Sequence, residues 1–208
     1  DKTSDPKSTQ KQIISPVIIE KMLNKIEVME KIGDDSLQDI KKKEKAFQEL
    51  QNIPEYRKIM QIADLNSSFY FGNKIEGTDY RIPASFYYDL IASLFGSEEE
   101  WRHKTKYPWF KKAIEMGKEK SFFHWELEYP EIFFEKGTWK ENRGWDVVIG
   151  NPPYDVISEK EQNREVEAEK RYYGIDPIYL AAVGSKLNYY RLFIAKAISL
   201  LQKDGMHG

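Results

Sequence analysis

The stretch from Trp145 to Tyr154, W-D-V-V-I-G-N-P-P-Y, constrains the fold more than any other part of the chain. Residues 145–149 form a short apolar run with three β-branched residues, which predicts a strand buried on both faces of a parallel sheet. Gly150 and two prolines then end the strand, because proline fixes its own backbone angle and donates no backbone hydrogen bond. Asn151 is left at the carboxyl end of the strand, where open α/β sheets bind their ligands.

The four residues after Gly150 form a corner that suits a flat molecule carrying an amino group. They place an amide side chain, backbone carbonyl groups and an aromatic ring in fixed relative positions. Asn151-Pro152-Pro153-Tyr154 at the end of a strand resembles the catalytic motif of amino-group methyltransferases, above all the gamma-type DNA adenine-N6 enzymes. A strand-ending turn that happens to carry these residues is the alternative, and the apolar strand before the corner favours the catalytic motif.

This resemblance implies a role for each residue of the corner. The amino nitrogen of adenine is a poor nucleophile, because its lone pair is delocalised into the ring. The Asn151 side-chain oxygen and the Pro152 carbonyl would accept hydrogen bonds from it and direct its lone pair towards the methyl donor, S-adenosylmethionine. Tyr154 would stack on a base flipped out of the duplex. The predicted catalytic residues are therefore Asn151, Pro152 and Tyr154, and the predicted substrate-binding residues are Pro153 and Tyr154. Asp146 is interpreted as an anchor of the strand.

A second motif, F-F-H-W-E-L-E-Y-P-E-I-F-F-E, occupies residues 122–135. Apolar and polar residues alternate from Trp125 to Tyr129, which predicts a half-buried strand that turns at Pro130. The motif is similar to the F-H-W-x-x-E-[FY]-P-E-[VI]-F signature before N-P-P-Y in type IIG restriction–modification enzymes, which fuse a methyltransferase to an endonuclease. Release-factor glutamine methyltransferases use N-P-P-Y but are not expected to carry this signature, so DNA is the expected substrate. The motif's carboxylates are interpreted as facing water: Glu126, Glu128 and Glu131.

Helical periodicity dominates the first half of the chain. The predicted helices begin at Pro16 after a Ser15 cap, at Ser36 with Asp39 as its capping acid, at Pro54, after Pro83, and at Glu98 with a break near Pro108. The first two should form an antiparallel hairpin with a solvated lysine face. Residues 62–72 and the aromatic helix after Pro83 also resemble helices of the type IIG enzymes.

The end of the chain is predicted to be less regular until its last helix. A polar loop or broken helix is expected over 155–171, and an irregular segment over 172–185. The last helix should run from Asn188 to a stop at Gly205, and it resembles the family's N-L-Y-x-L-F segment.

Composition excludes several classes of protein. The 208 residues carry a net charge of −2 and no cysteine, which excludes disulfides and thiolate metal sites. The three histidines lie far apart in the sequence, so no metal site is predicted. No stretch approaches the roughly 20 apolar residues that span a bilayer, so no membrane partner is expected. The expected location is the cytoplasm of a bacterium or archaeon.

Charge is uneven along the chain. Between Arg102 and Lys120, seven Lys and Arg residues accompany two Glu and are interleaved with Tyr107, Trp109 and Phe110. Such a segment either contacts DNA phosphates or forms the solvated face of a helix, and both interpretations remain open. The candidate DNA contacts are Arg102, Lys104, Lys106, Lys111 and Lys112.

The predicted fold class is α/β. Residues 1–14 are expected to be a flexible, polar lead-in and 15–118 a helical region. Residues 119–208 are expected to form part of the Rossmann-like sheet of a methyltransferase that depends on S-adenosylmethionine. None of the 12 glycines is followed by another two positions later, so the family's G-x-G cofactor loop is missing and no cofactor-binding residue is predicted. We expect a fragment that binds S-adenosylmethionine weakly or not at all by itself. Its expected partners are double-stranded DNA and the rest of a longer polypeptide.

The sequence leaves two other functions open. A protein-glutamine or RNA amino-group methyltransferase would use the same corner, and a methyl-transfer assay on each substrate separates it from a DNA enzyme. The second alternative is a non-catalytic module that contacts DNA or another part of a larger enzyme. Titration with the cofactor tests that alternative.

Overall fold

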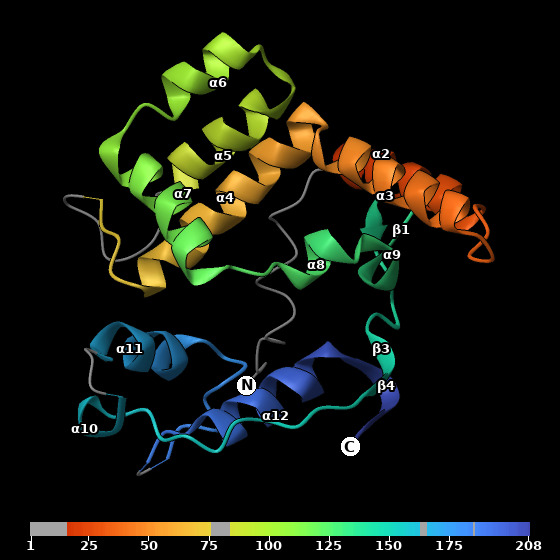
Figure 1. Ribbon diagram of the computed structural model, residues 1–208. Coiled ribbons are helices and arrows are strands. Elements are labelled where there is room, and N and C mark those ends of the chain that lie inside the picture. Colours follow the sequence, from red (N-terminus) through yellow and green to blue (C-terminus); the bar gives the residue numbers. More distant parts are fainter. Residues whose placement is uncertain (1–15, 76–83, 163–165, 185) are drawn as a thin grey trace. The chain divides into compact units, whose positions relative to one another are not determined.

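The computed structural model describes residues 16–75, 84–162, 166–184 and 186–208 (Figure 1). The predicted lead-in at 1–14 and the predicted Ser15 cap lie outside the described residues. Contacts within the chain divide it into two compact units. The helical unit contains the described residues of 13–69 and 73–140, and the sheet unit contains those of 70–72 and 141–208.

Short helices build most of the helical unit, as the periodicity predicts. In chain order they are α2 (Pro16–Glu30), α3 (Leu37–Gln51), α4 (Pro54–Tyr70), α5 (Ala84–Ala92), η2 (Ser93–Phe95), α6 (Glu98–Lys104) and α7 (Pro108–Lys120). Prolines stand at the first position of α2, α4 and α7, where a missing backbone N–H costs nothing. The helix predicted from Glu98 is confirmed together with its break before Pro108.

Helices α2 and α3 pack against each other and confirm the predicted hairpin. Ser36 caps α3: its hydroxyl accepts a hydrogen bond from the Asp39 backbone N–H at 3.1 Å and donates one to the Asp39 carboxylate at 2.6 Å. The pKa of the Asp39 carboxyl is lowered, first by this bond and then by Lys42. Most of the apolar side chains of α3 stay exposed, and Leu50 alone of this helix is buried.

The core of the helical unit lies between α2, α4 and the helices after it. Its apolar members lie at helical spacing, so each helix turns one face inwards. The members with the lowest exposure include Ile18, Ile19 and Met22 on α2, Ile59, Ile62, Leu65 and Phe69 on α4, and Leu90 and Leu94 at the end of the α5–η2 segment. Lys58 is also buried, and its ammonium group donates to the Gly96 carbonyl oxygen at 2.8 Å.

The prediction of a half-buried strand over 122–135 is wrong. The segment forms two single-turn helices, α8 (Trp125–Glu128) and α9 (Pro130–Phe133), and only then a strand, β1 (Phe134–Glu135), which pairs antiparallel with β2 (Thr138–Trp139). Pro130 starts α9, because proline at the first helical position needs no hydrogen-bond partner. A five-residue alternation cannot separate a strand from one helical turn, and no neighbouring strand is available to pair with it among the described residues.

The sheet unit contains a parallel β–α–β arrangement. Strand β3 (Trp145–Val148) pairs in parallel with β4 (Leu201–His207), and α12 (Tyr189–Leu200) contacts both strands. Helices α10 (Glu159–Gln162) and α11 (Glu167–Ile175) lie in the connection. The broken helix predicted there is confirmed, although α11 extends into the segment predicted to be irregular. Parallel neighbours joined by a helical crossover are the unit from which α/β sheets are built, so the predicted α/β class is confirmed.

The predicted stop of the last helix at Gly205 is wrong. Helix α12 ends at Leu200, and Gly205 lies inside β4. The register explains why a glycine stands there: Trp145 pairs with Leu201 and Val147 with Met206, so β4 bulges between these pairs. A Cβ atom on Gly205 would lie 2.8 Å from the Trp145 carbonyl oxygen.

Strand β3 confirms the predicted strand but not its burial on both faces. Val147 is 44% exposed, Ile149 just after the strand is 81% exposed, and Met206, the partner of Val147, is 67% exposed. In the described chain β3 belongs to a sheet of two strands, in which β4 is its neighbour. Burial of a strand on both faces needs a layer of helices on each side of the sheet, and this small sheet is not covered in that way. Among the described residues, no helix has the length and apolarity needed to cross a bilayer.

Candidate active site

The N-P-P-Y corner follows β3 at the carboxyl edge of the parallel pair. Two backbone hydrogen bonds of 3.1 Å, both made by Gly208, close this edge: the Gly150 N–H donates to the Gly208 carbonyl, and the Gly208 N–H donates to the Val148 carbonyl. The corner therefore starts from a fixed point on the sheet. This edge is where α/β sheets carry their ligand sites.

The other end of the corner is fixed to the start of α12. The Tyr189 N–H donates to the Asp155 carbonyl at 3.0 Å, and Val156 forms an isolated bridge with Asn188. Asn188 is also the N-cap of α12, because its side-chain oxygen accepts from the Arg191 N–H at 3.0 Å. The five residues from 151 to 155 thus run between two anchored points.

The side chains of the corner are accessible. Asn151 is exposed, and its carboxamide makes no hydrogen bond to another described residue, so its oxygen is free to accept from a ligand. Pro152 and Pro153 are half-buried, and Tyr154 is 76% exposed. The structure brings the four predicted residues together on one short segment.

Asp146 lies on β3 and anchors it to β4, as interpreted from the sequence. Its carboxylate accepts a hydrogen bond from the Gln202 side-chain amide. Asn142 extends the link, because it donates to the Gln202 side-chain oxygen at 2.8 Å and accepts from the Lys203 N–H at 3.0 Å. Asp146 is therefore occupied in holding the strands together.

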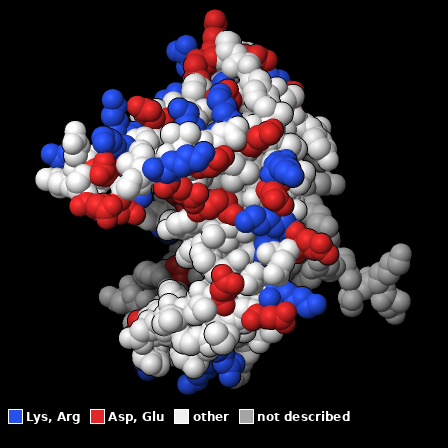
Figure 2. Space-filling model, turned by 90° about the vertical axis from the view of Figure 1, so that its right-hand side faces the viewer, with Lys and Arg blue, Asp and Glu red and all other residues white. Residues whose placement is uncertain are grey.

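The candidate DNA contacts belong to the helical unit. Arg102 and Lys104 end α6, Lys106 lies in the turn, and Lys111 and Lys112 lie near the start of α7. Lys104 is paired with Asp89, and the other four side chains are exposed. On the face drawn in Figure 2, Lys and Arg side chains are interspersed with Asp and Glu side chains.

An aromatic cluster lies in the same part of the helical unit. The rings of Tyr107 and Trp109 are stacked, with centroids 5.2 Å apart and planes 8° apart. The ring of Phe86 in α5 is T-shaped to both of these rings, with its centroid 6.1 Å from that of Tyr107 and 5.0 Å from that of Trp109. Sequence reasoning placed the aromatic residues beside the basic ones, but it had no signal for their stacking.

The second motif has a packing role in the helical unit. His124 Nε2 lies 2.9 Å from the Asp64 carboxylate of α4, and the two side chains are 12% and 20% exposed. Gly117 of α7 makes room for this pair, because an added Cβ would lie 2.7 Å from Asp64 Cγ. Sequence reasoning missed the pair, since nothing in one sequence links positions 60 residues apart.

The interpretation of the motif's glutamates as facing water is wrong. Glu126, Glu128 and Glu131 are all half-buried. Burial raises the pKa of the Glu128 carboxyl, and His124 nearby lowers it less. Burial likewise raises the pKa of the Glu131 carboxyl, with Glu30 adding to the rise. The short helices α8 and α9 turn these side chains towards the unit, which the predicted strand would not do.

A parallel β–α–β unit, with an exposed amide side chain and an exposed aromatic ring at its carboxyl edge, places this unit in the α/β class. The chain belongs to the Eco57I restriction-modification methylase family, because the model of that family matches residues 58–208. Comparison with curated proteins gave no match, and comparison with solved structures gave none either. The family match confirms the prediction of a methyltransferase of a restriction–modification system.

Proposed function

We propose that this chain carries the substrate side of the catalytic site of a gamma-type DNA adenine-N6 methyltransferase, of the type IIG kind. The observation that carries this proposal is the N-P-P-Y corner at the carboxyl edge of a parallel strand, with a free carboxamide at Asn151 and an exposed ring at Tyr154. A methyltransferase that acts on an amino group needs acceptors for its hydrogens, and this corner has them.

The chemistry follows from the groups on the corner. The Asn151 side-chain oxygen and the Pro152 carbonyl accept the two hydrogens of an adenine amino group and favour a pyramidal nitrogen. These acceptors act most strongly as positive charge develops on that nitrogen. The Tyr154 ring stacks on the base, and stacking of about 1–3 kcal/mol per base offsets much of the few kcal/mol that base flipping requires.

S-adenosylmethionine would supply an activated methyl group. The chain contains no G-x-G sequence, and none of its residues is assigned to hold this cofactor. The proposal therefore includes a partner, the rest of a longer polypeptide, that completes the cofactor pocket. Calorimetry on the 208-residue chain should detect weak binding or none, whereas low-micromolar binding would place a cofactor site within this chain.

The central test is Asn151→Ala in the full-length enzyme. Loss of an acceptor that acts on developing charge should lower kcat about a hundredfold or more, with little change in DNA affinity. Asn66→Ala is the matched control, because Asn66 is an exposed asparagine on α4. Full activity of Asn151→Ala would reduce the corner to a turn. Methyl transfer to release-factor glutamine or to RNA, and not to DNA adenine, would overturn the substrate assignment.

Tyr154 is tested by a pair of substitutions. Tyr154→Ala should weaken retention of the flipped base, and Tyr154→Phe should retain activity, because the ring face and not the hydroxyl stacks on the base. The fluorescence of 2-aminopurine at the target position reports flipping independently of methyl transfer. Equal losses for Tyr154→Ala and Tyr154→Phe would assign the function to the hydroxyl.

We also propose that the basic surface, defined as Arg102, Lys104, Lys106, Lys111 and Lys112, contacts DNA phosphates. The stacked rings of Tyr107 and Trp109 support this, because nucleic-acid surfaces combine cations with aromatic rings. Replacing Lys111 and Lys112 with Ala should flatten the slope of log affinity against log salt by about one unit per lost contact. The control is the same change at Lys41 and Lys45, exposed lysines of α3. An unchanged slope would return this surface to the solvated interpretation.

A further inference from the structure

Tyr154 does not stand alone on the surface of the sheet unit. Its ring stacks on that of Tyr190, with centroids 5.9 Å apart and planes 13° apart. Rings that are nearly parallel at this separation form an offset stack, one of the two arrangements that aromatic pairs favour. Tyr190 is 41% exposed, and sequence reasoning assigned it no role beyond the start of a helix.

The backbone fixes where these two rings lie. Tyr154 is followed by Asp155, whose carbonyl accepts the Tyr189 N–H, and Tyr190 follows Tyr189 in the first turn of α12. The Asn188 cap holds that turn in place. Each ring is thus one residue from a shared backbone hydrogen bond, and their stacking does not depend on a flexible connection.

Resting on the proposed function, we propose that Tyr190 is a positioning residue for the flipped base. Its ring backs one face of Tyr154 and leaves the opposite face of Tyr154 for the base, so that three rings stack in order. An exposed tyrosine samples several rotamers, and ordering one on binding costs affinity. The Tyr190 ring holds Tyr154 in the stacking orientation before the base arrives.

This role differs from direct contact with the base in one measurable way. Tyr190 acts through Tyr154, so its effect must vanish when the Tyr154 ring is absent. A residue that touched the base directly would lower retention of the base in either background. A double-mutant cycle over the two tyrosines separates these cases.

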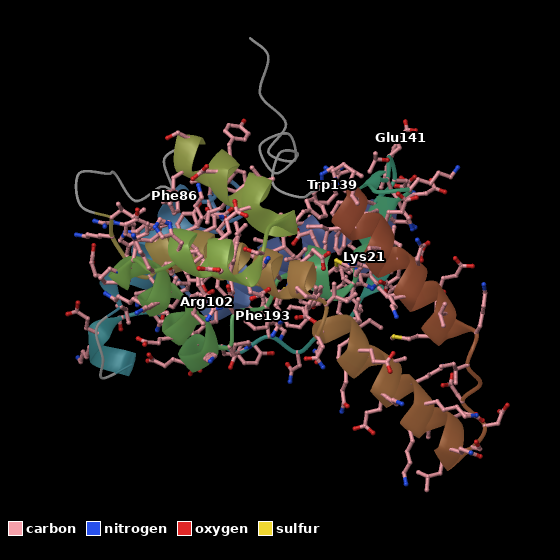
Figure 3. The ribbon with its side chains drawn as sticks, turned by 90° about the horizontal axis from the view of Figure 1, so that it is seen from above. Lys21, Phe86, Arg102, Trp139, Glu141 and Phe193 are labelled. Carbon is pink, nitrogen blue, oxygen red and sulfur yellow. The ribbon has the colours of Figure 1, made fainter. Side chains whose placement is uncertain are left out.

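The experiment uses the full-length enzyme on two DNA substrates: fluorescence of 2-aminopurine at the target position reports base retention, and DNA with adenine at that position gives KM and kcat. Tyr190→Ala should weaken retention of the flipped base about three- to tenfold, the range expected for one aromatic pair. Tyr190→Phe should restore it, because the ring is kept. In the Tyr154→Ala background, Tyr190→Ala should have no further effect. The control is Phe193→Ala, one turn along α12 and 53% exposed; Figure 3 labels Phe193.

Three results would overturn the role of Tyr190. They are unchanged base retention in Tyr190→Ala, additive losses in the cycle, and equal losses in Tyr190→Phe and Tyr190→Ala. Each of these can be recorded while the wild-type enzyme methylates adenine, so each rejects the role alone. A wild-type enzyme that methylates no adenine in DNA rejects the proposed function, and the role of Tyr190 with it.

Discussion

The two units of the chain differ in how far they bury their apolar side chains. In the helical unit, Ile19, Ile62 and Leu65 are fully buried. In the sheet unit, Ile149 is 81% exposed and Met206 is 67% exposed, beside a smaller core formed by other residues. Helices that follow one another along the chain cover one another, whereas a two-stranded parallel sheet has a face and edges that need further layers.

The difference also separates packing residues from residues available for chemistry. The second motif lies in the helical unit, and its His124 is hydrogen-bonded to Asp64 in a partly buried site. The N-P-P-Y corner lies in the sheet unit, where Asn151 and Tyr154 are exposed. Two motifs that resemble those of one family of enzymes therefore lie in different environments, one partly buried and one exposed. The predictions below test this division between the units.

The largest effect is expected from Gly144→Ala in the sheet unit. Gly144 has a φ of +119°, and an added Cβ would lie 2.5 Å from backbone atoms at the junction of α12 and β4. Backbone atoms cannot move aside as a flexible side chain can, so the free energy of unfolding of this unit should fall by about 3 kcal/mol or more. Hydrogen exchange should show lost protection in β3, β4 and α12, with α2, α4 and α7 unaffected.

Gly174→Ala in α11 is the control, because an added Cβ there meets nothing within 4 Å. Alanine favours a helix over glycine by about 1 kcal/mol, so this variant should be unchanged or slightly more stable. Loss of protection throughout both units in Gly144→Ala would mean that the units do not hold their structure separately, and the comparison would break.

The second-largest effect is expected from Gly117→Ala in the helical unit. Its effect on the free energy of unfolding should change sign when Asp64 is also replaced. An added Cβ would lie 2.7 Å from Asp64 Cγ, and Asp64 is held by its hydrogen bond to His124. Overpacking costs about 1–3 kcal/mol and outweighs the roughly 1 kcal/mol gained from helix propensity, so Gly117→Ala should destabilise the unit. In an Asp64→Ala background the clash is gone, and the same change should be stabilising. Urea unfolding of the four proteins measures both signs, and destabilisation in both backgrounds would contradict the packing role of Asp64.

Sequence patterns predicted the helices well, because caps and apolar spacing are local signals. Ser36 with Asp39, and the prolines at the first position of α4 and α7, mark starts that the structure confirms. Two of the errors have one cause: the predicted strand over 122–135 and the predicted burial of β3 both depend on neighbours that a local pattern does not specify. The corner at 151–154 was found because proline and glycine act locally, whereas the stacking of Tyr190 on Tyr154 joins two residues that are far apart in the sequence.

A smaller effect is expected from Ser36→Ala at the start of α3. The Ser36 hydroxyl accepts from the Asp39 N–H and donates to its carboxylate, so its loss leaves one helix donor without its cap. Replacing such a cap costs about 1 kcal/mol of helix stability. Because α3 buries only Leu50, the loss should appear as faster hydrogen exchange in its first turn, with a small change in the global unfolding midpoint.

The matched variant is Ser97→Ala at the cap of α6, since Ser97 accepts from the Glu100 N–H at 3.1 Å. A shift of several degrees in the midpoint for Ser36→Ala alone would show that α3 contributes more to the core than its exposure indicates.

The smallest effect concerns a half-buried carboxyl of the helical unit, that of Glu131. Its Oε2 is buried without a hydrogen-bond partner among the described residues, and burial raises its pKa in the folded protein above the ordinary value of 4.5. Between these two pKa values the folded state binds more protons than the unfolded state, so stability falls as pH rises through this window. Glu131→Gln keeps the shape without the charge, so it should raise the melting temperature at pH 7, and its advantage should shrink as pH falls towards 4.5.

The control is Glu135→Gln, a change at an exposed residue of β1, because it alters the net charge in the same way. If the melting curves of Glu131→Gln and the wild type keep a constant separation from pH 4 to 7, water reaches the Glu131 carboxylate. The side chains around α9 would then be as accessible to water as those of the sheet unit. The contrast in burial between the two units would hold only for the helices that precede α9.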